Sequence, residues 1–111
     1  MSLKRVNGMV SHHYNNKRYK REYFINKYLN GDGKVIDSFV VDKGHPNGAE
    51  RHDITENGII VIYNALSGKE VTKLIARPNQ IKRYYRGTGR EPPKELLDLC
   101  EQHKSLGYNH I

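Results

Sequence analysis

The sequence predicts one α+β domain, with an antiparallel sheet of about four strands and a C-terminal amphipathic helix. Short runs rich in β-branched residues are separated by glycine-containing turns, which is typical of antiparallel strands. The clearest helix signal comes last, after the prolines at 92 and 93. A chain of 111 residues has room for a single core. We therefore expect a flexible basic arm over residues 1–16 and one domain over residues 17–111.

The first element of the domain can be read in two ways. Residues 17–29 fit a helix loosely and a strand with one gap. The sequence NGDG at residues 30–33 is a strong turn signal between two runs rich in β-forming residues. It favours a β-hairpin that joins residues 24–29 to residues 34–41, with a helix as the alternative for its first half.

The middle of the chain predicts the centre of the sheet. Residues 43–50 are rich in glycine, proline and asparagine and indicate a loop. Residues 51–63 form a strand region with a second turn signal, ENG, at residues 56–58. The run GIIVIY that ends this region predicts a central strand buried on both faces. Residues 70–76, EVTKLIA, follow as its antiparallel neighbour.

Two helices are expected after the last strand. Pro78 ends that strand and can open a short basic helix over residues 79–86, which the glycines at 87 and 89 break. The prolines at 92 and 93 open the C-terminal helix, and Gly107 ends it. The apolar stripe of this helix consists of Leu96, Leu97, Cys100 and Leu106.

The composition limits the classes of protein. Cys100 is the only cysteine, so neither an intrachain disulfide nor a cysteine-based zinc site is expected. Basic residues interrupt every apolar stretch in the first thirty residues, which argues against a signal peptide or a membrane span. We therefore expect a cytoplasmic protein with no membrane partner, no cofactor and no bound metal.

The net charge of +7 is distributed unevenly along the chain. Residues 1–29 carry seven basic side chains and one acid, and residues 73–90 carry six basic side chains and no acid. Residues 30–72 and 91–111 are acidic overall. Two basic segments on either side of an acidic middle indicate a polyanionic partner rather than a uniformly solvated surface.

Tyrosines stand among the basic residues of both segments, and this combination favours a nucleic acid as the partner. Lys and Arg neutralise phosphates, while aromatic rings stack on unpaired bases, so we favour RNA over DNA. The expected contact residues are Lys17, Arg18, Lys20 and Arg21 in the first segment and Lys73, Lys82, Arg83, Tyr84, Tyr85 and Arg86 in the second.

Residues 45–52 hold the densest cluster of groups suited to acid–base chemistry. His52 or Glu50 could act as a general base and His45 as a general acid for RNA cleavage without a metal. Cations for the pentacoordinate phosphate would come from Arg51, Lys73 and Arg77. The alternative is an ordinary polar loop in which the histidines are solvated.

The order of segments over residues 45–85 also suggests a family. A segment with His, Glu and Arg precedes the strand GIIVIY, and after a turn the strand VTKLIAR leads into a basic segment with two tyrosines. This order resembles the small ribonucleases grouped with barnase, EndoU, colicin D and the RelE toxins. The resemblance implies toxin-like, metal-independent RNA cleavage on a sheet. It implies Thr72 and Arg77 near the phosphate, and Tyr84 or Tyr85 as a stacking or proton-handling group. The chain also resembles short proteins of phages and mobile elements of low-GC bacteria.

Three functions stay open from the sequence. The first is an endoribonuclease, and the second is a non-enzymatic protein that binds nucleic acid through the basic segment of residues 77–90. The third is a protein-interaction module, with a homodimer or an acidic protein as the partner. An enzyme requires residues 45–52 and 73–85 to converge in one cleft, whereas a binding protein requires only a continuous basic surface.

Overall fold

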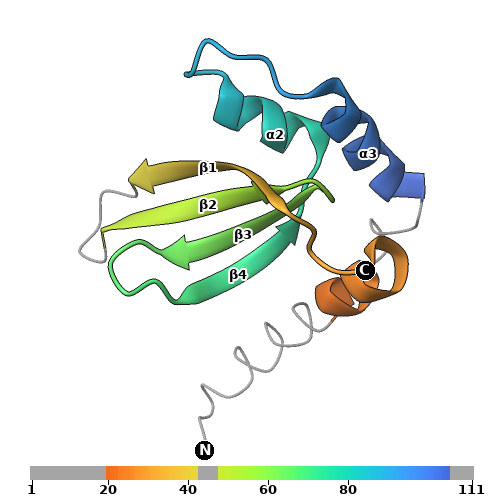
Figure 1. Cartoon of the computed structure of the whole chain (residues 1–111), viewed down its shortest axis with the longest axis horizontal. Coiled ribbons are helices and arrows are strands. Elements are labelled where there is room, and N and C mark those ends of the chain that lie inside the picture. Colours follow the sequence, from red (N-terminus) through yellow and green to blue (C-terminus); the bar gives the residue numbers. More distant parts are fainter. Residues whose placement is uncertain (1–19, 43–47, 106–111) are drawn as a thin grey trace, which may run out of the picture.

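The computed structural model describes residues 20–42 and 48–105 and has the α+β fold that the sequence predicts (Figure 1). Four antiparallel strands pair in chain order, so each strand lies next to its neighbours in the sequence. They are β1 (Val35–Asp42), β2 (Ala49–Thr55), β3 (Ile59–Asn64) and β4 (Glu70–Ile75). The expected arm of residues 1–16 lies outside the described residues.

Two helices follow the sheet and pack against one of its faces, above the strands in Figure 1. They are α2 (Pro78–Tyr85), which is the predicted short basic helix, and α3 (Lys94–Ser105), which is the predicted C-terminal helix. Helix α2 begins with Pro78 in its first turn, where the missing N–H of proline is not needed. The Gln80 side-chain oxygen accepts the Arg77 backbone N–H at 2.8 Å, which satisfies a group that the first turn leaves unpaired.

The predicted hairpin before β1 is wrong, and the helical alternative is correct. Residues 20–24 are α-helical and continue into the π-helical turn η1 (Ile25–Leu29). This segment, orange in Figure 1, covers the face of the sheet opposite α2. Phe24 and Ile25 are each only 2% exposed and pack with β3. Successive residues of a strand point to opposite faces, so a strand could not direct both side chains to one core.

The NGDG sequence ends this helix instead of forming a hairpin turn. Asn30 has a left-handed backbone with φ of 58°, and Gly31 follows with φ of 98°. The Asn57 amide donates to the carbonyls of Leu29 and Gly31 at 3.0 and 2.9 Å, which joins this end to the β2–β3 turn. The predicted turn therefore exists, but it connects a helix to β1.

Strand β3 is buried on both faces, as its sequence predicts. Residues Ile59, Ile60, Val61 and Ile62 are at most 8% exposed. Ile60 and Ile62 belong to the cluster under α2 and α3, whereas Ile59 and Val61 belong to the cluster under η1. The alternation of side chains therefore fixes which residues of the neighbouring strands face α2.

Candidate active site and basic surface

The site begins with a row of side chains across the sheet on the side of α2. The pairing register aligns Phe39 of β1, His52 of β2, Ile62 of β3 and Thr72 of β4. His52 is only 6% exposed, and a buried polar ring requires hydrogen-bond partners. Both of its ring nitrogens have one. The Nδ1 atom lies 2.6 Å from the Tyr84 hydroxyl, and the Nε2 atom lies 3.0 Å from Glu50 Oε1.

The chemistry of the partners assigns the tautomer of His52. An ionised carboxylate can only accept, so Nε2 carries the hydrogen and donates it to Glu50. In a neutral ring Nδ1 is then an acceptor, and the Tyr84 hydroxyl donates to it. The three side chains form a directed chain from Tyr84 through His52 to Glu50. Such a chain can pass a proton from the hydroxyl to the ring while the carboxylate stabilises the resulting cation.

Tyr84 reaches the sheet from α2, 32 residues beyond His52 in the chain. Its ring lies 5.4 Å from the Phe39 ring, with an angle of 33° between the two planes. Burial of Tyr84 and the nearby Glu50 carboxylate raise the pKa of the phenol, while Arg83 opposes them. The phenol therefore stays protonated at neutral pH.

A hollow of about 540 Å³ lies beside His52 and Tyr84, and we call it the His52 hollow. Its walls include apolar side chains from the sheet and polar side chains from α2. The sheet contributes Phe39, Val40, Val41, Ile62, Leu74 and the ring of His52, and α2 contributes Gln80, Arg83 and Tyr84. A second hollow of about 490 Å³ shares Leu74, Gln80 and Arg83 and adds Arg77. His52 and Arg77 therefore line adjoining hollows rather than the same one.

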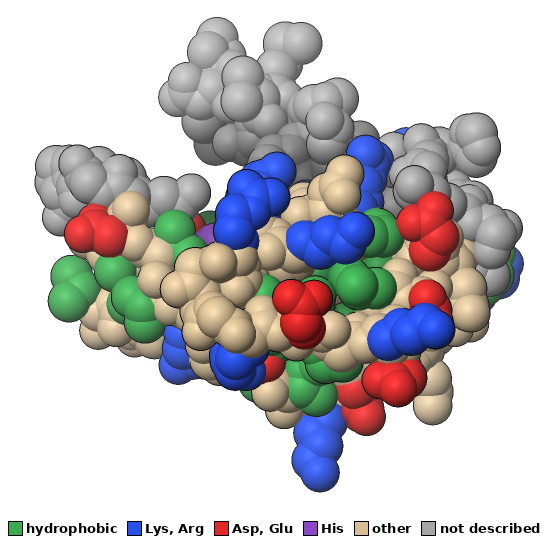
Figure 2. All heavy atoms as spheres, turned by 90° about the horizontal axis from the view of Figure 1, so that it is seen from above, with side chains coloured by type: hydrophobic (Ala, Val, Ile, Leu, Met, Phe, Trp, Pro, Cys, Tyr) green, Lys and Arg blue, Asp and Glu red, His purple; other side chains and the backbone are tan. Residues whose placement is uncertain are grey.

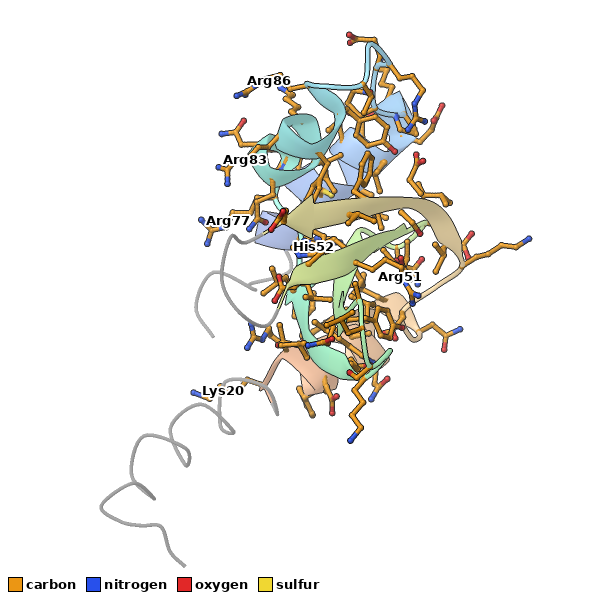
Figure 3. All side chains as sticks on the ribbon, turned by 90° about the vertical axis from the view of Figure 1, so that its left-hand side faces the viewer. Lys20, Arg51, His52, Arg77, Arg83 and Arg86 are labelled. Atoms are coloured by element: carbon orange, nitrogen blue, oxygen red, sulfur yellow. The ribbon has the colours of Figure 1, made fainter. Side chains whose placement is uncertain are left out.

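The outer side of α2 is basic. Lys82, Arg83 and Arg86 are exposed, and none of them forms an ion pair with a carboxylate of the described residues. Figure 3 shows Arg77, Arg83 and Arg86 on one side of the molecule, one above the other. In Figure 2, Lys and Arg side chains lie at the upper edge of the helical face, one of them beside a small visible part of a histidine, and others lie along the lower and right edges. These basic side chains next to the His52 hollow give this edge its positive charge.

Tyr85, expected in the nucleic-acid interface, is a core residue. It is 2% exposed, and its hydroxyl donates to Asp37 of β1. Arg90 binds the same carboxylate at 3.3 and 3.4 Å, and its guanidinium lies 5.2 Å from the centre of the Tyr85 ring. Burial, together with the Asp37 hydrogen bond, raises the pKa of Tyr85 to about 12. Tyr85 and Arg90 therefore tie the end of α2 to β1.

Two of the expected cations lie on the opposite face of the sheet from His52. Lys73 pairs with Asp32 at 2.9 Å, and although burial opposes it, the Asp32 carboxylate raises the pKa of this lysine. Arg51 binds Asp53 at 3.1 Å and lies 4.3 Å above the Tyr63 ring. Arg83, which the sequence assigned to binding alone, is instead the cation that lines the His52 hollow.

The remaining expected residues are distributed as follows. Thr72 stands in the same row as His52, and its buried hydroxyl has no hydrogen-bond partner among the described residues. Lys20 is exposed and lies on the same side of the molecule as Arg77, Arg83 and Arg86 in Figure 3, at the lower end. Arg21 is half-buried. His45, Lys17 and Arg18 lie outside the described residues.

Sequence reasoning missed the partnership of Tyr84 with His52 and the position of Gln80 between the two hollows. The helical spacing of four between Gln80 and Tyr84 places them on one side of α2 and was an available signal for Gln80 alone.

The comparisons with protein-family models, curated sequences and solved structures find no match to this chain. Over residues 20–42 and 48–105, no three His, Cys, Asp or Glu side chains gather in a way that could hold a metal ion. In the same part of the chain, no helix has the length and apolar character needed to span a membrane.

Proposed function

We propose that this chain binds single-stranded RNA on the α2 side of the sheet and cleaves it without a metal ion. The observation that carries the proposal is the series of hydrogen bonds from Tyr84 through His52 to Glu50, which starts at a hollow lined by both Tyr84 and Arg83. A half-buried carboxylate, a buried imidazole and a hydroxyl in this order form a proton-transfer system. A guanidinium next to it suits a phosphate.

The reaction that fits this system is attack of the ribose 2′-hydroxyl on the adjacent phosphorus. The O2′–P bond forms, the P–O5′ bond breaks, and the 2′-hydroxyl must lose its proton. The Tyr84 oxygen has free lone pairs because its hydrogen is directed at His52. It would accept the 2′ proton while passing its own to Nδ1, and Glu50 would stabilise the imidazolium. Tyr84 and His52 therefore act together as the general base.

The other two requirements are charge stabilisation and a proton for the leaving 5′-oxygen. Arg83 lines the hollow that contains Tyr84, and a guanidinium there would stabilise the charge on the pentacoordinate phosphate. Arg77 lines the adjoining hollow and would bind a neighbouring phosphate. The leaving-group proton was assigned to His45 from the sequence. His45 lies outside the described residues, and this role stays a prediction.

Replacement of Tyr84 with phenylalanine tests the proposal. The substitution keeps the ring against Phe39 and removes only the hydroxyl, so we expect cleavage to slow by about 10²- to 10⁴-fold, as for loss of a positioned base. Binding of a non-cleavable RNA analogue should be unchanged. The matched control is Tyr63→Phe, which removes a hydroxyl on the opposite face of the sheet and should leave the rate unaltered.

The products and the metal requirement complete this test. Cleavage by the wild-type chain should continue in EDTA and leave 2′,3′-cyclic phosphate ends. His52→Ala and Glu50→Gln should also slow it. Full activity in Tyr84→Phe, or products without cyclic phosphate, would contradict the proposed mechanism.

A non-enzymatic RNA-binding protein is the second candidate. It is favoured by the burial of His52, because a histidine with both nitrogens bonded also serves to fix a helix on a sheet. In that case RNA binds to Lys82, Arg83 and Arg86, no cleavage product appears, and Tyr84→Phe lowers the stability of the protein without affecting affinity.

A further inference from the structure

We infer that the His52 hollow is a subsite for one nucleobase and that Gln80 selects bases with a carbonyl group over bases with an amino group. This inference rests on the proposed RNA binding and adds to it which group of the RNA, a nucleobase, the protein recognises. It follows from the shape of the hollow, from the fixed orientation of Gln80 and from the cation beside them.

The hollow has the size and lining of a site for a flat, partly apolar ligand. Its volume of about 540 Å³ lies within the range of about 300–1,000 Å³ that is usual for small-molecule sites. Phe39, Val41 and Leu74 supply apolar surface, and the Tyr84 ring supplies an aromatic wall on which a base can stack. Arg83 at the same hollow suits the phosphate attached to that base. A nucleotide combines these features.

The hydrogen bond at the start of α2 fixes the amide of Gln80. The atom 2.8 Å from the Arg77 backbone nitrogen must be an acceptor, because the Arg77 N–H can only donate. The oxygen of Gln80 therefore occupies that position, and its NH₂ group is the other end of the amide. That NH₂ group has no acceptor among the described residues. It is also absent from the buried side-chain atoms that lack a partner, so it is accessible to solvent. Gln80 lines the His52 hollow, and the part of its amide that the Arg77 N–H does not hold is the NH₂ group, which can donate there.

A donor of this kind distinguishes bases by the group on their edge. Uracil has a carbonyl oxygen at the position where cytosine has an amino group, and inosine differs from adenosine in the same way. The Gln80 NH₂ group can donate to a carbonyl oxygen, whereas an amino group leaves two donors facing each other. We therefore expect bases with a carbonyl group to bind more tightly, by about three- to tenfold, the effect of one hydrogen bond.

The decisive variant is Gln80→Glu. A carboxylate oxygen still accepts the Arg77 N–H, so the start of α2 stays satisfied, and negative charge is favourable in a first helical turn. The hollow, however, would now receive an acceptor in place of donors. The added charge will also weaken RNA binding in general, and Asn79→Asp controls for this. Asn79 is the preceding helical residue, is exposed, and lines only the second hollow.

The experiment measures the dissociation constants of four 2′-fluoro hexamers, which have no 2′-hydroxyl and cannot be cleaved by this route. Fluorescence anisotropy compares the uridine hexamer with the cytidine hexamer and the inosine hexamer with the adenosine hexamer. The wild-type chain should prefer uridine and inosine, and Gln80→Glu should remove or reverse both preferences. Asn79→Asp should weaken all four hexamers by a similar factor and keep the preferences.

Two results would overturn the inference in different ways. Equal affinity of the wild-type chain for uridine and cytidine, or a preference that survives in Gln80→Glu, would overturn base reading by Gln80 while leaving RNA binding intact. Failure of all four hexamers to bind at low salt would overturn the proposed RNA binding itself.

Discussion

Replacement of Gly58 with alanine should destabilise the protein by about 2–5 kcal/mol, for two reasons that the structure separates. Gly58 has φ of 77°, and a left-handed backbone costs a residue with a side chain roughly 1–2 kcal/mol. An added Cβ would also lie 2.8 Å from His103 Cε1 and 3.1 Å from Cys100 Sγ. His103 is 2% exposed and its Nδ1 lies 3.3 Å from the Ala76 carbonyl oxygen, so its ring has little room to move. Overpacking of this kind adds about 1–3 kcal/mol.

Gly68 provides a matched control for the free-energy cost of a left-handed backbone. Its φ of 76° is nearly the same, but an added Cβ would meet no atom within 4 Å. Gly68→Ala should therefore lose only about 1–2 kcal/mol. Urea unfolding followed by circular dichroism gives both free energies, and the difference measures the contact with α3. Equal losses in the two variants would refute the argument that α3 is packed tightly against the β2–β3 turn.

Two further predictions concern the basic surface and the core. The affinity for single-stranded RNA should fall steeply between about 50 and 200 mM salt, and the triple reversal of Lys82, Arg83 and Arg86 to Glu should lower it further. Unchanged affinity in a folded triple variant would remove α2 from the interface. Because the folded protein raises the pKa of Tyr85 from 10.0 to about 12, its contribution to stability is complete below pH 10 and is lost as the pH rises toward 12. Urea unfolding at pH 9 and 11 should show a larger loss in the wild-type chain than in Tyr85→Phe, which keeps only the smaller contribution of the raised pKa of Tyr84.

The sequence predicts the sheet and the C-terminal half of this fold well because each signal there is local. The run GIIVIY is apolar at every position, and a short run of this kind between two turns is typical of a strand with both faces covered. Pro78 marks the start of α2 in the same local way. Residues 24–29 carry no such signal, since their helix depends on packing against Ile59 and Val61, which are far away in the sequence. Tertiary contacts decided between two conformations that local propensity left nearly equal.

The candidate site was predicted in part, and the missing part depends on which face each strand residue occupies. His52 and Glu50 are two residues apart, so a strand places them on one face, where they meet at 3.0 Å. By the same rule Thr72 and Lys73 cannot face one site, although the residue types favour both as neighbours of a phosphate. In the structure Thr72 lies in the same row as His52, whereas Lys73 lies on the opposite face of the sheet. Tyr84 meets His52 across 32 residues, and no local pattern could indicate this contact.

The two tasks proposed for α2 fall on different sides of the same eight-residue helix. Gln80 and Tyr84 are four residues apart and line the His52 hollow, whereas Lys82 and Arg86 have the same spacing and are exposed on the outer side. Arg83 lies between these pairs and belongs to both surfaces. An RNA backbone that follows the outer side can therefore reach Tyr84 only if one nucleotide turns inward past Arg83. Cleavage would then require a flexible, unpaired strand, and an RNA duplex should bind through its phosphates without being cut.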